Sequence, residues 1–156
     1  MKAVVQRAFA ASVEVEGEVI GEMAKGLVVF LGAHQDDTDA DAAKMADRVV
    51  GLRIFSDEEG KMNLSLRDLW ARDEQAGVLA ISNFTLYGDA SKNRRPSFIT
   101  AAPYDEGNRL FERFVEELRR LDCPVETGVF GADMKVRLVN DGPVTLILEV
   151  MGGVLR

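Results

Sequence analysis

Hydrophobic residues in this chain follow the spacing of β-strands in several places. Between residues 12 and 16, two valines alternate with polar side chains, the period of a strand with one buried face. Residues 2–16 are interpreted as a strand pair, with a turn signal at Glu16-Gly17-Glu18 and a return that starts at Val19-Ile20. Continuous apolar runs at residues 27–31 and 78–81 are typical of strands buried on both faces.

Two further segments have the spacing of helices. Thr38 is suited to cap a helix near residues 39–52, because two aspartates follow in the first turn and apolar residues recur at helical spacing. A second helix is predicted over about residues 104–121 and ends before Pro124. Its apolar stripe consists of Leu110, Phe111, Phe114, Val115, Leu118 and Leu121.

The chain closes with two alternating segments, residues 134–138 and 144–150, which predict two strands with a turn at residues 140–143 between them. Many of the strands follow one another without a helix in between, which favours a mixed or antiparallel sheet. We therefore predict an α/β fold. It is a single compact domain with a twisted, mostly antiparallel or mixed, half-barrel-like sheet and two main helices.

Composition narrows the class of protein. With 156 residues, 47% of them hydrophobic, the chain is expected to form one folded domain. Its net charge of −7 argues against a general nucleic-acid coat protein, and we expect no DNA partner. Contact with a short piece of RNA remains compatible with the charge, and the best local phosphate contacts are Lys92, Arg94 and Arg95.

The rare residues exclude other classes of site. One cysteine and one histidine leave no disulfide framework and no structural zinc site within the chain, and we expect no metal and no cofactor. No apolar run approaches the roughly 20 residues that a membrane-spanning helix needs, and the N-terminus has no secretory apolar region. A cytoplasmic location without a membrane partner is therefore expected.

The usual catalytic motifs are missing. The chain has no Gly-x-Ser-x-Gly elbow, no Gly-x-x-x-x-Gly-Lys phosphate loop and no Gly-x-Gly-x-x-Gly motif. His34 and Cys123 are interpreted as structural residues, and no pair of carboxylates stands out for acid/base catalysis. By composition alone, Ser82-Asn83-Phe84-Thr85 is an ordinary strand end and Asn140-Asp141-Gly142-Pro143 an ordinary turn, although a Gly-Pro bond can also be cis.

Taken together, these two segments resemble the D-aminoacyl-tRNA deacylase family, also described as D-tyrosyl-tRNA deacylases. The resemblance runs nearly end to end, with residues 151–156 as a short tail beyond a shared domain at residues 1–150. It departs from the family pattern Ser-Gln-x-Thr at Asn83, whose amide is one methylene shorter. The other matching pieces are residues 5–7, 11–13, 53–57, 60–64, 95–98 and 128–134.

The resemblance implies a homodimer with active sites at the subunit interface, which cleaves the ester between a D-amino acid or glycine and the terminal adenosine of tRNA. It implies that Gly142 and Pro143, joined by a cis bond, enter the partner's pocket and exclude L-amino acids, with Arg7 supporting their loop. It further implies that Ser82, Asn83, Phe84 and Thr85 line the pocket and that Ala101 lies near the substrate amine.

An aminoacyl ester is already activated, so positioned water, backbone N–H groups and the 2′-hydroxyl of the RNA could suffice for hydrolysis. We favour this mechanism over a covalent intermediate on Thr85, which either acts as nucleophile or positions groups. A filter that works by size cannot reject glycine. Two alternatives stay open at this point: a relative with a trans Gly142-Pro143 bond that edits L-aminoacyl-tRNA, and a dimeric RNA-binding module without activity.

Overall fold

A six-stranded sheet carries the fold, and the computed structural model describes all 156 residues. The strands lie in the order β6-β5-β2-β1-β7-β8. Neighbours in the group β2, β1, β7 and β8 pair antiparallel, whereas β2, β5 and β6 pair parallel, so the sheet is mixed as predicted. The bounds are β1 (Lys2–Val15), β2 (Glu18–Gly32), β5 (Gly77–Ser82), β6 (Val125–Thr127), β7 (Met134–Met151) and β8 (Val154–Leu155).

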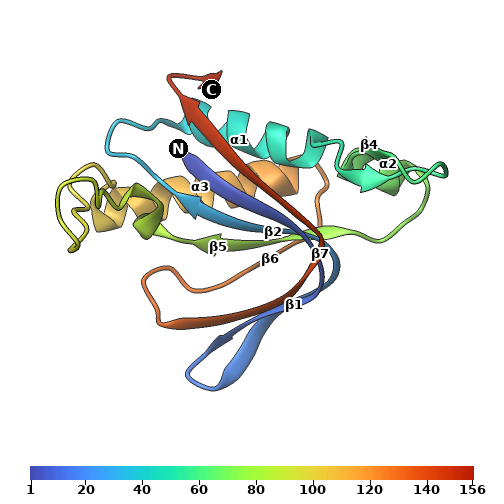
Figure 1. Ribbon diagram of the computed structural model, residues 1–156, viewed down its shortest axis with the longest axis horizontal. Coiled ribbons are helices and arrows are strands. Elements are labelled where there is room, and N and C mark those ends of the chain that lie inside the picture. Colours follow the sequence, from blue (N-terminus) through green and yellow to red (C-terminus); the bar gives the residue numbers. More distant parts are fainter.

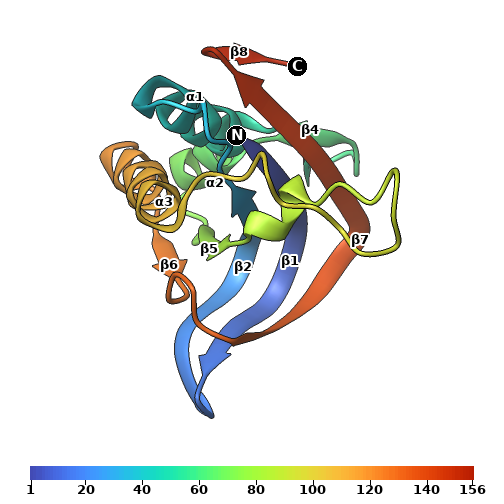
Figure 2. The ribbon, with the colours of Figure 1, turned by 90° about the vertical axis from the view of Figure 1, so that its left-hand side faces the viewer.

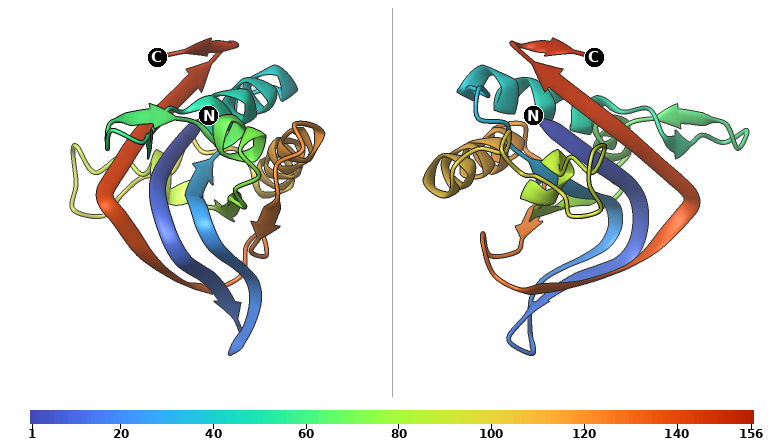
Figure 3. Two further views of the ribbon diagram at one scale, coloured as in Figure 1. Left: turned by 90° about the vertical axis from the view of Figure 1, so that its right-hand side faces the viewer. Right: turned by 60° about the vertical axis from the view of Figure 1, so that its left-hand side comes forward.

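The long strands bend strongly along their length, which gives the sheet the shape of an open half-barrel (Figure 1). Three helices lie on one side of it: α1 (Asp39–Gly51), α2 (Leu66–Ala71) and α3 (Tyr104–Arg120) (Figures 2 and 3). The predicted α/β half-barrel fold is therefore confirmed, with α1 and α3 as its two main helices and the short α2 as a third. No helix has the length and apolar character that a membrane crossing requires.

Residues 27–31 pack into two different hydrophobic clusters, which explains why all five positions are apolar. Leu27, Val29 and Leu31 point toward the helices and belong to the larger cluster. Val28 points to the other face, where it joins the smaller cluster inside the curl of the sheet. The helices bury Met45, Val49, Leu110, Phe114 and Leu118 against the larger cluster.

The prediction of a turn at residues 140–143 was wrong. β7 continues through this segment and stays paired with β1 on both sides of it. Gln6 pairs with Thr145, but Ala8 pairs with Asn140, so residues 141–144 lie opposite the single residue Arg7. These four residues form an enlarged β-bulge, which lies at the surface and does not reverse the direction of the chain.

Several short elements escaped the pattern analysis. They are α2, the 3₁₀-helix η1 (Phe84–Tyr87), and the strands β3 (Phe55–Ser56), β4 (Met62–Leu64), β6 and β8. A turn at residues 57–60 joins β3 to β4. The predicted helix over residues 104–121 is α3, which ends at Arg120. It stops before Pro124 because the backbone of Asp122 is left-handed, with a φ of 57°.

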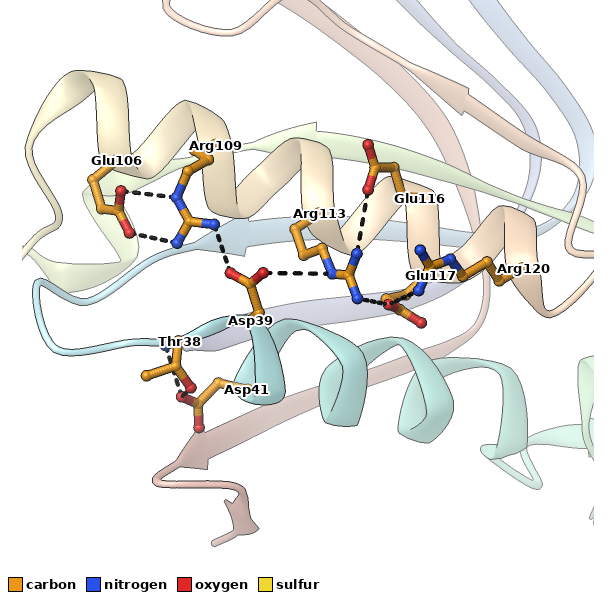
Figure 4. A network of polar contacts seen from close by, with 9 residues as sticks. All are labelled: Thr38, Asp39, Asp41, Glu106, Arg109, Arg113, Glu116, Glu117 and Arg120. Carbon is orange, nitrogen blue, oxygen red and sulfur yellow. Dashed lines mark hydrogen bonds and ion pairs between the residues drawn. The ribbon is translucent and has the colours of Figure 1, made fainter.

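A network of ion pairs fixes the start of α1 against α3 (Figure 4). Arg109 of α3 lies 2.5 Å from a carboxylate oxygen of Asp39 and 2.6 Å from one of Glu106. Arg113, one turn further along, contacts Glu117 at 2.5 Å and Asp39 at 3.9 Å. The hydrogen bond from Arg109 lowers the pKa of Asp39, so this carboxylate stays ionised at neutral pH. The network therefore secures the end of the loop that leads from β2 to α1.

Candidate active site

A cavity of about 600 Å³ opens at one end of the sheet, at the carboxyl end of β5. Four separate parts of the chain form its walls: Phe30 of β2, the end of β5 with η1, the start of α3, and the connection from β6 into β7. Its lining is mostly apolar and rich in aromatic rings. The residues are Phe30, Ile81, Ser82, Asn83, Phe84, Ala102, Tyr104, Phe130, Gly131, Ala132, Asp133, Met134 and Val136.

The end of β5 places Ser82, Asn83 and Phe84 in the wall of this cavity. The backbone N–H of Asn83 donates to the carbonyl of Leu31 at 2.8 Å, which extends the pairing of β5 with β2 by one residue. Gly32 lies close by, and a Cβ there would be 2.8 Å from the Asn83 carbonyl oxygen. The chain then turns into η1. The hydroxyl of Ser82 is half-buried and makes no hydrogen bond within the protein.

Thr85 lies one step further, and the structure does not place it among the residues that line the cavity. Its side chain is exposed, and its hydroxyl donates to the amide oxygen of Asn83. No histidine or carboxylate contacts this hydroxyl. Thr85 therefore has a hydrogen-bond acceptor in the chain but no base that would turn it into a nucleophile.

Ala101 also lies beside the cavity rather than in its wall, where its neighbour Ala102 takes its place. Ala101 forms a β-bridge with His34, and the N–H of Ala102 donates to the carbonyl of Ala33 at 2.9 Å. The loop that contains His34 is held in turn by Asp37, which accepts a hydrogen bond from the N–H of His34 at 2.6 Å. The ring of His34 accepts a hydrogen bond from the N–H of Asp36 and packs against Tyr87, so both its backbone and its side chain contact the surrounding fold.

Gly142 and Pro143 are exposed at the top of the bulge in β7, and the bond between them is cis. Arg7 holds the bulge from below: its guanidinium pairs with Asp141 at 2.7 Å and donates to the carbonyl of Ile54 at 2.5 Å. Asn140 closes the base of the bulge, because its amide donates to the carbonyls of Arg7 and Val144, each at 3.0 Å. Arg7 and Asn140 therefore tie the bulge to β1 and to the carbonyl of Ile54.

The predicted site residues form two groups within one chain. Ser82, Asn83 and Phe84 follow β5, whereas Gly142 and Pro143 lie on β7. Two strands, β2 and β1, separate β5 from β7 in the sheet. The cavity has no lining residue from the bulge. A single chain therefore does not bring the two groups together.

The cavity contains little acid/base chemistry. Its titratable side chains are Tyr104, at the start of α3, and Asp133, in the connection from β6 to β7. No cluster of three or more metal-ligating side chains is present in the structure. Burial raises the pKa of the Cys123 thiol to about 12, so this cysteine is protonated at neutral pH and has a packing role. Besides its two titratable side chains, the cavity provides an apolar aromatic surface, backbone groups, the hydroxyl of Ser82 and the amide of Asn83.

Sequence reasoning missed Tyr104, Phe130 and Met134 as individual wall residues. They stand in three different contexts, a helix start, a loop and a strand start, and no spacing connects them. The family resemblance at residues 128–134 was the only signal that pointed to the last two. A second hollow of about 560 Å³ between β2, β5 and α2 contains none of the predicted site residues.

Comparison with known proteins agrees with this geometry. The family model described as D-Tyr-tRNA(Tyr) deacylase matches residues 4–149. A protein of Geobacter metallireducens named D-aminoacyl-tRNA deacylase is 56% identical over 149 residues, which cover 96% of this chain and 95% of that protein. A protein of Thermotoga petrophila with the same name is 54% identical and covers 96% of this chain and 97% of its own length.

Two solved structures have the same fold. One is titled c-Myc DNA Unwinding Element Binding Protein; it has a TM-score of 0.88 at 37% identity and covers 97% of this chain and 100% of its own. The other is titled as a probable eukaryotic D-amino acid tRNA deacylase; its TM-score is 0.76 at 17% identity, covering 94% and 97% of the two chains, and it supports the fold alone.

The family model and these relatives identify the half-barrel chain as a hydrolase of the deacylase type. The chain belongs to the D-Tyr-tRNA(Tyr) deacylase family, and the resemblance stated from the sequence is confirmed.

Proposed function

We propose that this protein hydrolyses the ester of D-aminoacyl-tRNA and of glycyl-tRNA, and spares L-aminoacyl-tRNA. The observation that carries the proposal is the near-full-length similarity, above 50% identity, to proteins named D-aminoacyl-tRNA deacylase. The cavity supports it, because aromatic rings suit the terminal adenosine of a tRNA and the adjoining end of β5 supplies polar groups for the ester.

The chemistry requires little from side chains. A water molecule adds to the ester carbonyl, the bond from the acyl carbon to the ribose oxygen breaks, and that oxygen takes a proton. Backbone N–H groups beside the Ser82 hydroxyl polarise the carbonyl, and the 2′-hydroxyl of the RNA assists the water. Since Thr85 has no base, it positions groups through Asn83 rather than attacking the ester.

The chiral filter completes the proposal. Two copies of the chain form a homodimer in which Gly142 and Pro143 of one subunit enter the cavity of the other. Their exposure, and the distance in strand order from their own cavity, support this arrangement. Exposed apolar side chains on the same strand, Val139 and Ile147, supply contact area for a second copy. Main-chain atoms of the inserted segment then occupy the space that an L side chain needs.

The test of this function compares matched substrates. D-tyrosyl-tRNA and glycyl-tRNA are expected to be hydrolysed, whereas L-tyrosyl-tRNA is expected to remain intact at the same enzyme concentration. Release of the amino acid is measured over time for all three. Comparable rates on the D and L forms would contradict the filter, and selective hydrolysis of the L form would favour an L-editing relative. Binding of tRNA without turnover would favour a non-enzymatic module.

Replacement of Thr85 by alanine is expected to leave part of the activity, within about tenfold of the parent, because no step depends on a base at this hydroxyl. Thr100→Ala is the matched control, since Thr100 is also exposed and close to the site. Single-turnover rates on D-tyrosyl-tRNA measure the effect. An acyl group trapped on Thr85 would establish covalent catalysis and overturn this mechanism.

Gly142→Ala is expected to reduce discrimination between D- and L-tyrosyl-tRNA at least tenfold. Gly142 has a φ of 124°, and a Cβ there would lie 2.6 Å from the backbone nitrogen of Val144. The segment must therefore move, and a displaced filter no longer excludes the L side chain. Gly17→Ala is the control, because Gly17 also has a positive φ but open space around it. Unchanged discrimination in Gly142→Ala would show that the filter lies elsewhere.

A further inference from the structure

The loop between η1 and α3 carries an unusual concentration of positive charge. Lys92, Arg94 and Arg95 stand within four residues of one another, all three are exposed, and none takes part in an ion pair. This contrasts with the rest of the chain, where more than half of the lysine and arginine side chains pair with carboxylates. The three cations therefore have no carboxylate partner, although the chain has more acidic than basic residues and a net charge of −7.

The base of this loop is firmly closed. Asp89 and Ser97 form a β-bridge with hydrogen bonds of 2.8 and 2.9 Å in the two directions. The carboxylate of Asp89 accepts a hydrogen bond from the N–H of Ser91 at 2.9 Å, and it forms no ion pair with the three cations. The tip that carries the positive charges therefore projects from a fixed base into solvent (Figure 2).

The loop is also joined directly to the cavity. Phe98, immediately after the bridge, packs edge-on against Phe84 with 5.1 Å between the ring centroids. Phe84 is part of the cavity wall. The chain then continues to the cavity residues Ala102 and Tyr104. The base of the charged loop therefore adjoins the cavity wall at Phe84.

We infer that Lys92, Arg94 and Arg95 bind backbone phosphates of the RNA acceptor stem whose 3′ end occupies the cavity. This inference rests on the proposed function. When the terminal nucleotide of an RNA occupies the cavity, the phosphates of the preceding nucleotides lie outside it. Exposed cations without ion pairs, on a loop whose base adjoins the cavity wall, are suited to bind such phosphates. The contacts fix the register of the stem, whereas the cavity recognises its terminal nucleotide.

The test is the salt dependence of RNA binding. An acceptor-stem RNA hairpin that ends in CCA and carries no amino acid is titrated with the parent protein and with the triple variant Lys92→Gln/Arg94→Gln/Arg95→Gln. The titrations are run between about 50 and 300 mM salt. Three lost phosphate contacts are expected to make the slope of log Kd against log salt shallower by about 2 to 3. The control variant is Lys44→Gln/Arg48→Gln/Arg119→Gln, which removes the same charge from other side chains without ion pairs. Its slope is expected to change by less than about 1.

A second measurement separates this inference from the proposed function. The two triple variants are assayed on D-tyrosyl-tRNA and on adenosine carrying the same D-tyrosyl ester, which has no phosphates. The inference predicts that the ratio of kcat/KM on tRNA to that on the adenosine ester falls only in the loop variant. An equal fall on both substrates would show that the loop merely supports the cavity, and identical salt slopes in parent and loop variant would overturn the phosphate contact. If the parent hydrolyses neither substrate, the proposed function fails, while the binding slopes still decide the inference.

Discussion

Replacement of Asp37 by asparagine is expected to lower the free energy of unfolding by about 3–5 kcal/mol, the usual cost of removing one partner from a buried ion pair. One carboxylate oxygen of Asp37 lies 2.5 Å from the ammonium nitrogen of Met1, and the other accepts from the N–H of His34. The Met1 side chain is 0% exposed and that of Asp37 only 3%. Asparagine would therefore leave a buried positive charge without a counter-ion.

Chemical denaturation measures this loss, and the melting temperature is expected to fall by roughly 6–20 °C for a chain of this size. The matched control is Asp36→Asn, because the side chain of Asp36 is 79% exposed and contacts only His34, at 3.6 Å. We expect a change below about 0.5 kcal/mol there. An Asp37→Asn variant as stable as the parent would contradict the ion pair.

Most of the regular structure follows from local patterns in the chain. Residues 27–31 are apolar at every position because they contact a hydrophobic cluster on each face, and the pattern predicted this. The cap of α1 was also predictable, since Thr38 donates both its N–H and its hydroxyl to Asp41. α2 is only six residues long, too short for a period to be recognised, although Ser65 and Asp68 form the same kind of cap.

The bulge in β7 could not be predicted from local patterns. Asp-Gly and Gly-Pro are turn signals, so the local sequence of residues 140–145 predicts a reversal of the chain. It contains no signal that the strand continues in the same direction. What decides the outcome is pairing with β1, more than 130 positions earlier in the chain: Asn140 bonds to the carbonyl of Arg7, and Gln6 bonds to Thr145. Long-range register of this kind is invisible to a pattern of near neighbours.

The candidate site was predictable only in part for the same reason. The polar residues at the end of β5 are contiguous and could be singled out as Ser82-Asn83-Phe84-Thr85. The aromatic wall opposite them comes from residues 104 and 130, which only the packing of α3 against the curled sheet brings together. The assignment of roles depended on the family resemblance, because no spacing in the chain indicates which hydroxyl faces the cavity.

The parallel part of the sheet depends on a close approach of two glycines. Gly26 of β2 pairs with Gly77 of β5, at the start of their shared ladder. Gly26 has a φ of 148°, and a Cβ at this position would lie 2.0 Å from the carbonyl oxygen of Gly77. The obstacle is backbone, so no side chain can rotate away. Gly77 in turn lies close to Pro124, because a Cβ there would be 2.7 Å from its carbonyl oxygen.

Gly26→Ala is therefore expected to force β2 and β5 apart and to lower the free energy of unfolding by about 3 kcal/mol or more, combining a steric clash with an unfavourable backbone angle. Gly60→Ala is the control, since Gly60 has a φ of 76° but no atom within 4 Å of the added Cβ. Gly60→Ala is expected to lower the free energy of unfolding only by the cost of placing alanine at a positive φ, about 1 kcal/mol. Denaturant unfolding of both variants measures the difference. Equal losses would show that the sheet opens without penalty at Gly26, and that the narrow spacing of β2 and β5 is not what selects glycine there.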